Sequence, residues 1–369
     1  MPVFSLPKAI KWPHFILMGA LALLVWFLSA VNTAEATDHC IHLPYLPDCQ
    51  NESGDEQRDE QSEATATFAE PQPAEDSFLD TNLYVRLADN TNVYAEPSLQ
   101  APVVRNTNAG FLFATVFSVE DVDGVYWYQI NYGEFVHEDN VERREISQFR
   151  GIEVLNQPER PFGWIVQDVQ PSDAPDEEPD PETEEMVRYT FFEVYDSVLG
   201  EDDWLWYQLE NGQWIRQTFV SLVYVTEPPS HIGDGELWTQ VDLYEQTFAA
   251  YEGERMVFAS LISSGLNQWP TYEGTYQVEE RFRYYKMSGA EGQSDYYFIE
   301  DVPHIMYFDF FNGIAFHGAY WHDRFGFKAS HGCVNMPPYV SEWVFNWSEG
   351  ADNELHVEVF TSDPLDSLE

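Results

Sequence analysis

The residue types best suited to nucleophilic chemistry lie together near the C-terminal end of this 369-residue chain. Cys333 follows Ser330, His331 and Gly332, and His317 stands sixteen residues before it. A cysteine attacks a carbonyl carbon as its thiolate, and a nearby imidazole can take the thiol proton and hold the resulting ion pair. Glycine beside the nucleophile lets backbone N–H groups face the oxygen that becomes negative during acyl transfer. The pattern therefore predicts cysteine-dependent acyl transfer.

Histidine density in the same stretch makes a metal site a competing interpretation. His304, His317, His322 and His331 all precede Cys333 closely. Zinc sites usually present ligands at short spacings such as H-x-x-x-H or C-x-x-C, whereas His317 and His322 are five residues apart on an aromatic loop. We therefore expect no metal, and we interpret His304 and His322 as core or rim residues.

The N-terminal segment has the features of a targeting sequence. Lys8 and Lys11 precede an apolar run over residues 15–31, and an Ala-x-Ala site follows at residues 34–36. Signal peptidases read small residues at these two positions. We expect residues 1–36 to be a signal peptide, or an uncleaved membrane anchor, because the run is slightly long for a signal core. Either outcome places the folded part in the extracytoplasmic cell envelope, secreted or tethered.

Cysteine usage agrees with export. Cys40 and Cys49 flank a short loop that a disulfide would close in an oxidising compartment. Cys333 is then left as a free thiol, which favours a chemical role over inert burial. Residues 37–79 are acidic and polar around this loop and are predicted to be a disordered linker, and residues 362–369 an acidic tail.

Composition excludes some functions and favours a β-rich fold. The chain carries 64 acidic and 17 basic residues, a formal net charge of −47. Such a field repels nucleic acid and anionic membrane surfaces. Hydrophobic residues make up 44% and aromatic residues 16% of the chain, which argues against wholesale disorder and fits compact β modules. A solubilising surface explains the acidity as well as a cationic partner does.

The middle of the chain contains an internal duplication. The sequence WYQI at residues 127–130 recurs as WYQL at residues 206–209, and each copy leads into a turn and another apolar strand. The second turn contains Asn211 and Gly212, a strong hairpin signal. Short runs of alternating apolar and polar residues, separated by Gly, Pro and Asn, favour small β-barrels.

Both copies resemble bacterial SH3-like domains, and residues 92–97 (NVYAEP) resemble the early loop of one. The resemblance implies repeat 1 over residues 80–148 and repeat 2 over residues 149–228. Residues 171–185 form a Pro-rich, acidic insertion in repeat 2, expected to be a flexible loop. Such repeats either bind wall peptide or glycan through exposed aromatic residues or act as spacers for an enzyme.

Several segments around Cys333 resemble one enzyme family. His317 and the sequence SHGCVN at residues 330–335 resemble the signature of L,D-transpeptidases with a YkuD-type catalytic domain. Residues 263–276 and 302–308 resemble further parts of that domain. The resemblance covers residues 235–361, the usual size of one domain. The whole chain is thus expected to be mainly β: two SH3-like barrels, then a β-rich catalytic domain with one or more short helices.

The resemblance implies a role for each residue of the site. Cys333 is the nucleophile, His317 is the general base and acid, and the carbonyl of Gly318 orients the His317 ring. Residues of the neighbouring loop build or brace the oxyanion pocket: Ser330, His331, Gly332 and Asn335. Substrate contacts fall to Tyr320, Trp321, Arg324 and Met306, with a surface ion pair as the alternative for Arg324.

Regular elements are expected to hold this site. Val340, Trp343, Val344 and Trp347 form one apolar face of a short helix that begins near a proline pair. Its N-terminus is expected to favour the Cys333 thiolate through the helix dipole. Alternating or apolar runs predict strands over residues 238–243, 247–251, 256–261, 302–308 and 356–360.

The family resemblance implies a peptidoglycan enzyme that needs no cofactor. Cys333 would cleave a donor stem tetrapeptide through a thioester and pass it to an acceptor amine, which crosslinks the wall. With water as acceptor the reaction would be that of an L,D-carboxypeptidase. Carbapenem-type inhibitors are expected to acylate the cysteine. The alternative from a different class is a non-catalytic wall-binding surface protein in which the SH3-like repeats carry the function.

Overall fold

The computed structural model describes residues 67–75, 77–179, 182–351 and 355–362. The predicted signal peptide, the proposed Cys40–Cys49 disulfide and most of the linker and acidic tail lie outside the described residues. In the part of the chain that is described, no helix has the length and hydropathy needed to cross a membrane.

A first seven-stranded sheet carries the strands predicted at the start of the catalytic segment. Its central strands pair antiparallel, while the strand near the C-terminus pairs parallel to its neighbour. Two short strands from outside that segment extend one edge. In spatial order the strands are β1 (Phe68–Ala69), β10 (Ile152–Val154), β19 (Arg255–Leu261), β18 (Thr247–Glu252), β17 (Leu237–Asp242), β25 (His356–Phe360) and β20 (Gly274–Gln277).

A second sheet holds the site and also crosses between segments. Strand β22 pairs antiparallel with β21 and β23, and its first residues pair parallel with β5 from the first predicted repeat. Repeat 1 therefore shares a sheet with the catalytic segment. The spatial order is β24 (Val334–Met336), β23 (Ile314–Gly318), β22 (Tyr297–Asp309), β5 (Phe111–Val116), β2 (Leu83–Leu87) and β9 (Val141–Arg144), with β21 (Glu280–Gly289) paired to β22 off this path.

The two predicted repeats form small antiparallel sheets. Repeat 1 adds one of five strands: β4 (Val103–Asn106), β3 (Asn92–Tyr94), β8 (Glu134–His137), β7 (Val125–Asn131) and β6 (Ser118–Val122). Repeat 2 has two of three strands: β12 (Phe191–Glu193), β11 (Phe162–Ile165) and β16 (Val220–Val223), then β13 (Asp196–Leu199), β14 (Leu205–Gln208) and β15 (Trp214–Arg216). These strands do not close into barrels in the described ranges, so SH3-like barrels are not confirmed.

The duplicated sequence nevertheless folds as predicted at the level of strands. Residues 127–130 lie in β7 and residues 206–208 in β14, and each is followed by a paired strand across a turn. An antiparallel β-bridge between Val169 and Met186 joins the two ends of the insertion at residues 171–185. The chain is thus mainly β, with the repeats contributing paired strands of their own.

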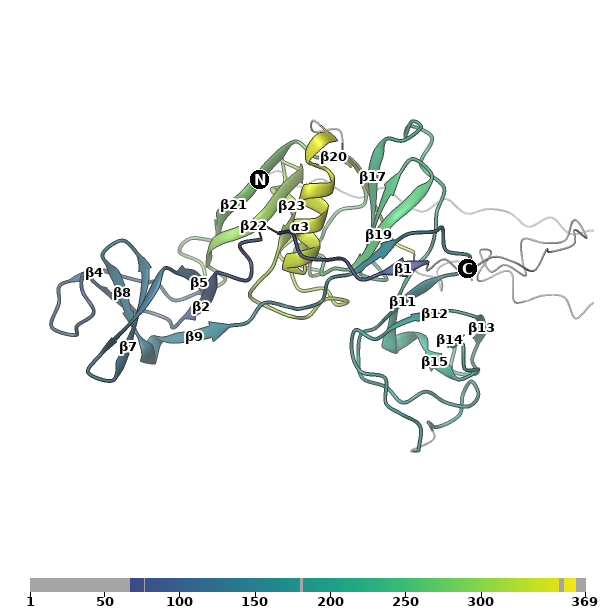
Figure 1. Ribbon diagram of the computed structural model, residues 1–369, viewed down its shortest axis with the longest axis horizontal. Helices are drawn as coiled ribbons and strands as arrows, with labels where there is room; N and C mark the ends of the chain where they lie inside the picture. Colours follow the sequence, from purple (N-terminus) through teal and green to yellow (C-terminus); the bar gives the residue numbers. More distant parts are fainter. Residues whose placement is uncertain (1–66, 76, 180–181, 352–354, 363–369) are drawn as a thin grey trace, which may run out of the picture. The chain divides into compact units, whose positions relative to one another are not determined.

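Helix α3 (Pro338–Trp347) is the only α-helix in the described ranges, and it lies beside β22 and β23 (Figure 1). Pro338 occupies its first turn, where the missing N–H costs nothing. Val340 and Val344 are fully buried, while Trp343 and Trp347 are half-buried at the edge of the core. Short 3-10 turns occur at Glu138–Asn140, Gln217–Phe219 and Glu349–Ala351.

One hydrophobic cluster joins the two large sheets and the helix. Phe248 from β18, Phe316 from β23 and Val340 from α3 are completely buried in it. The Phe316 ring meets the Phe248 ring edge-on with centroids 5.6 Å apart. Because Phe316 directly precedes His317 on β23, this core fixes the backbone that carries the proposed base.

We predict that Phe316→Ala lowers the free energy of unfolding by about 3–5 kcal/mol, because a buried aromatic ring leaves a cavity. Phe311→Ala is the matched control, since that ring is 97% exposed, and it should change stability by less than about 0.5 kcal/mol. Urea unfolding of both variants measures the difference. Equal effects of the two substitutions would contradict the described core.

Candidate active site

Strand pairing brings the proposed nucleophile and base to one face of the second sheet. Strands β23 and β24 run parallel, and His317 is in register with Asn335. Residues in register share a face, and so does the residue two positions earlier on the same strand. Cys333 lies directly before β24, two positions before Asn335, so extending the alternation of β24 by one residue puts its side chain on the His317 side of the sheet.

The His317 ring is held in one orientation by the next residue. Its Nδ1 lies 3.3 Å from the carbonyl oxygen of Gly318, so Nδ1 carries the proton and donates it to that oxygen. The other ring nitrogen, Nε2, is then left as an acceptor. Burial lowers the pKa of His317 to about 4, so the ring is neutral at neutral pH. An imidazole in this state can accept a thiol proton.

Close packing keeps the Gly318 carbonyl in place. A Cβ atom at Gly318 would lie 2.6 Å from Oγ of Ser341 and 2.7 Å from Cγ of Pro303. Both distances are far below van der Waals contact, so a larger residue would push the backbone away from helix α3. Glycine therefore allows the strand to approach the helix closely at the position that orients His317.

The Cys333 thiol is a neutral group in the free protein. Its Sγ donates to the carbonyl oxygen of Gly313 at 3.5 Å. Burial raises the pKa of Cys333 to about 11, although the backbone N–H of Ala315 favours the thiolate. Among the described residues, no hydrogen bond joins Sγ to the His317 ring.

Burial bears on the ionisation of both groups in the free protein. It disfavours the charge on His317 and on Cys333, so a preformed thiolate–imidazolium pair would be costly. Burial is the largest cause of the raised Cys333 pKa, and the expected effect of the α3 dipole stays a prediction. The geometry instead fits a thiol that loses its proton to His317 as the reaction proceeds.

A tight turn before Cys333 sets the position of the sulfur. Ser330 Oγ accepts from the N–H of Gly332 at 3.2 Å and donates to the carbonyl of Cys333. The Gly332 carbonyl accepts from Thr271 Oγ1 at 2.7 Å. Gly332 has φ +115°, a conformation that residues with a side chain rarely adopt. The turn is thus specified by Ser330, Gly332 and Thr271 together.

This turn narrows the candidates for an oxyanion pocket. The N–H of Gly332 is already bound by Ser330 Oγ, so it is not available in the free protein. The amides of His331 and Cys333 remain the candidate donors. The His331 ring is exposed and lies against the Trp269 ring, tilted by 33° with centroids 3.9 Å apart.

A contact between Asn335 and His322 joins strand β24 to the loop that follows β23. Asn335 Nδ2 lies 2.8 Å from Nε2 of His322, and the Asn335 backbone exchanges two hydrogen bonds with Ser263. Nδ1 of His322 accepts from the N–H of Arg324 at 3.2 Å. Burial lowers the pKa of His322 to about 4, and the nearby His317 ring adds to this shift. These contacts join β24 to Ser263 and to the loop that carries His322, and the bracing role of Asn335 stays a prediction.

The predicted substrate contacts divide into buried and accessible groups. Met306 is completely buried in the main core, and Tyr320 is 1% exposed with its hydroxyl on the carbonyl of Glu300. Neither can touch a substrate in this structure, so these two assignments are wrong. Trp321 is half-buried with its ring 5.5 Å from that of His317, and Arg324 is exposed.

His304 illustrates the expected core role of the remaining histidines. Its ring is fully buried between Phe78 and Phe345, with Nδ1 3.4 Å from Oγ of Ser341. Burial lowers the pKa of His304 to about 3, so it stays neutral. Within the described ranges, no three His, Cys, Asp or Glu side chains converge as metal ligands.

Two tyrosines near the Cys333 sulfur were not predicted from the sequence. Burial raises the pKa of Tyr297 and of Tyr307, and the charge of a Cys333 thiolate raises each further. Both belong to β22, and both rings are half-buried beside Cys333 in one cluster. Only their alternation along β22 could have indicated a shared face.

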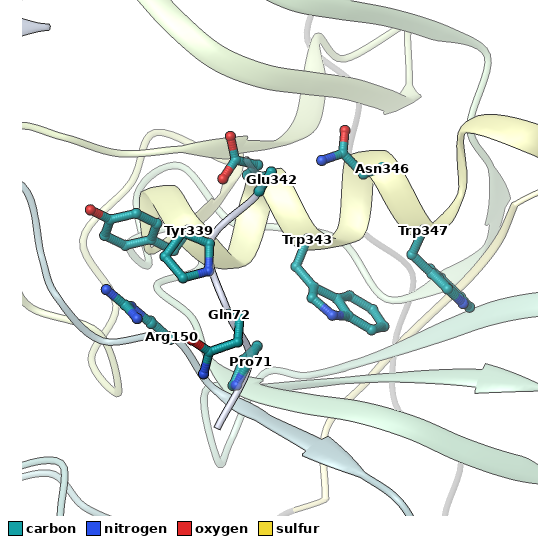
Figure 2. A pocket seen from close by; sticks show the side chains of 10 residues that line it. Pro71, Gln72, Arg150, Tyr339, Glu342, Trp343, Asn346 and Trp347 are labelled. Carbon is teal, nitrogen blue, oxygen red and sulfur yellow. The ribbon is translucent and has the colours of Figure 1, made fainter. Parts of the chain in front are cut away.

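A hollow of about 220 Å³ lies elsewhere, on the outer side of α3 (Figure 2). The helix contributes Tyr339, Trp343 and Trp347, and the segment at residues 71–74 lines it from across. Trp343 Nε1 donates to Glu153 on β10 at 2.9 Å. Neither His317 nor Cys333 lines this hollow, so it is not part of the candidate active site.

The candidate site combines His317 on β23 with Cys333 in the turn that leads into β24. A family model described as the L,D-transpeptidase catalytic domain, YkuD, matches residues 237–359. This part of the chain is therefore a YkuD-type catalytic domain, as its sequence motifs predicted.

Individual relatives match over parts of their length. A Bacillus subtilis (strain 168) protein, provisionally named L,D-transpeptidase YciB, is 26% identical over 154 residues, or 37% of this chain and 76% of that protein. The L,D-transpeptidase structure of Enterococcus faecium is 25% identical with a TM-score of 0.30, over 34% of this chain and half (50%) of that one. L,D-transpeptidase 3 of Mycobacterium tuberculosis, solved with a faropenem-derived adduct, is 19% identical with a TM-score of 0.31, over 40% of this chain and 72% of that one.

We predict that alkylation of Cys333 by iodoacetamide accelerates about tenfold per pH unit from pH 7 to pH 10. The buried thiol has a pKa of about 11, so its thiolate fraction is about 10⁻⁴ at pH 7 and rises through this whole range. Mass spectrometry of the Cys333 peptide gives the rate, with glutathione as a thiol of ordinary pKa. A plateau below pH 8 would show an ion pair with His317 and contradict the neutral ground state.

Replacing Gly332 by alanine should strain the turn before the nucleophile. We expect Gly332→Ala to cost about 1–3 kcal/mol, because alanine is disfavoured at φ +115°. Gly350→Ala serves as the control, since a Cβ there meets no atom within 4 Å. Urea unfolding compares the two, and equal stabilities would mean that the turn tolerates a side chain.

Proposed function

We propose that the protein is an L,D-transpeptidase that crosslinks peptidoglycan. Cys333 is the nucleophile, and His317 is the general base and acid oriented by Gly318. The donor is a stem tetrapeptide, and the acceptor is the side-chain amine of a second stem peptide. The reaction needs no cofactor.

The proposed reaction consists of two acyl transfers. In the first, His317 takes the thiol proton, the sulfur bonds to the carbonyl carbon of the third stem residue, and the C–N bond to the terminal D-alanine breaks. The proton passes from His317 to the leaving amine. In the second, the acceptor amine attacks the thioester, gives a proton to His317, and the C–S bond breaks to regenerate the thiol.

The match of residues 237–359 to the L,D-transpeptidase catalytic domain carries this proposal, and the register of His317 with Asn335, two residues after Cys333, supports it. The neutral states of both groups support a proton transfer coupled to attack. A preformed ion pair would carry a more nucleophilic sulfur but would be costly in this buried site.

The turn at Cys333 supports an oxyanion pocket made by the amides of His331 and Cys333. Donors aimed at a developing oxyanion are worth about 10²–10³ in rate. In this proposal the N–H of Gly332 stays bound to Ser330 Oγ and fixes the turn, so it does not donate to the oxyanion. Carbapenems, whose strained amide carbonyl presents the same electrophile, should acylate Cys333.

The chain is proposed to act outside the cytoplasmic membrane, where its substrate would be. A non-catalytic wall-binding protein is not favoured, because the catalytic domain and its residue pattern are both present. Contact of the repeats with wall glycan or peptide is proposed as an additional role. The reaction products show directly whether the acceptor is an amine or water.

We predict that the purified chain releases D-alanine from a disaccharide stem tetrapeptide and forms crosslinked dimers. Cys333→Ala should abolish release, and His317→Gln should lower kcat by about 10²–10⁴, the usual contribution of a general base. His356→Gln is the matched control, because His356 lies on β25 beside Glu236 and not on β23 or β24. Mass spectrometry separates dimer, the transpeptidase product, from tripeptide, the hydrolysis product.

Two outcomes would overturn the proposal. A folded wild-type chain that turns over no stem peptide would point to the non-catalytic class. Turnover that persists in Cys333→Ala would assign the chemistry to another residue.

A further inference from the structure

The loop that follows His317 is bound by a residue pair from the second predicted repeat. Arg188 Nη1 donates to the carbonyl oxygen of Asp323 at 2.6 Å, and Nη2 donates to that of Phe325 at 2.9 Å. These contacts join residues 135 and 137 positions apart in the sequence. One guanidinium thus spans two carbonyls of a short, otherwise irregular segment.

Tyr189 completes this contact. Its hydroxyl donates to Oδ1 of Asp323 at 2.7 Å and accepts from Arg188 Nη2 at 2.6 Å. The Arg188 guanidinium also lies over the Tyr189 ring, 4.2 Å from its centroid. On the other side, the Arg188 N–H donates to Asp168 of the same repeat at 2.6 Å. The pair is therefore anchored in repeat 2 and directed at the loop.

Apolar packing supports the same contact. Phe325 is completely buried in a cluster that includes Trp164 and Val166 of repeat 2. At Gly326 a Cβ would lie 2.5 Å from Cγ1 of Val166, so the loop backbone touches the repeat directly. The Gly326 N–H donates to Ile262 of the catalytic domain at 2.8 Å. The loop is thus wedged between the two parts.

The bound segment leads directly to the candidate active site. Asp323 follows His322, whose ring contacts Asn335, the residue in register with His317. Trp321, one residue earlier, lies against the His317 ring. A shift of residues 323–325 would therefore move Trp321, which lies against the His317 ring, and His322, which contacts Asn335.

We propose that Arg188 and Tyr189 are positioning residues for the acyl-transfer site, so that repeat 2 is an integral part of the enzyme. The inference rests on the proposed function. Arginine suits this role because its planar fork can reach two carbonyls at once, whereas lysine offers a single point charge. Misplacing groups by about 1 Å costs about 10² in rate even from a distance.

The test compares four variants of the full-length chain. Arg188→Ala removes both loop contacts, Arg188→Lys keeps the charge but can serve one carbonyl, and Tyr189→Phe removes the bond to Asp323. Arg160→Ala is the control, because Arg160 belongs to the same repeat and lies over the Tyr195 ring at 4.3 Å. Stem-peptide kinetics give kcat and KM, and amide hydrogen exchange reports the order of residues 322–326.

We expect kcat of Arg188→Ala to fall about 10–100-fold with KM changed less than threefold, together with faster exchange at residues 322–326. Arg188→Lys should recover part of kcat, and Arg160→Ala should match the wild type. A purely structural role would lower the folded fraction, and kcat per folded molecule would then equal that of the wild type.

Wild-type kcat and unchanged exchange in a folded Arg188→Ala variant would overturn the inference while leaving the proposed function intact. If Arg188→Ala does not fold, Arg188→Lys and Tyr189→Phe decide the matter: wild-type kcat and exchange in both would overturn it. An inactive wild type would instead overturn the proposed function, and the exchange data would still test the loop contact.

Discussion

The parallel pairing of β23 and β24 is the constraint on which the site depends. It places His317 in register with Asn335, two residues after Cys333, although sixteen residues separate the histidine from the cysteine in the sequence. The buried Phe316 anchors β23 in the core, and the Ser330–Gly332 turn delivers the chain to β24. A slip of one residue would turn the thiol to the opposite face, because side chains alternate along a strand.

Burial around this pair explains its chemistry. Burial of the His317 ring and partial burial of the Cys333 side chain disfavour the imidazolium and the thiolate, which favours an uncharged resting site. A neutral thiol is protected from oxidants that attack thiolates. The proposed reaction then needs a proton transfer that begins only when an electrophile is in place.

Sequence reasoning succeeded where local signals are strong and failed where long-range packing decides. The strands of the catalytic domain and the α3 helix followed from motifs and periodicity, while the roles of His317, Gly318 and Cys333 stay predictions. The burial of Met306 and the raised pKa of Cys333 depend on which elements cover them, and no spacing reveals that. The Arg188 contact joins residues more than 130 positions apart and was invisible for the same reason.

Strands borrowed from outside the catalytic segment have a consequence for the fold as a whole. β10 covers the edge of β19, and β5 covers the first residues of β22. Cutting the chain to residues 237–359 would leave both edges with unpaired N–H and C=O groups, which are templates for association with other chains. The N-terminal half therefore also protects these strand edges from edge-to-edge aggregation. A minimal catalytic fragment would need new edge residues to avoid such association.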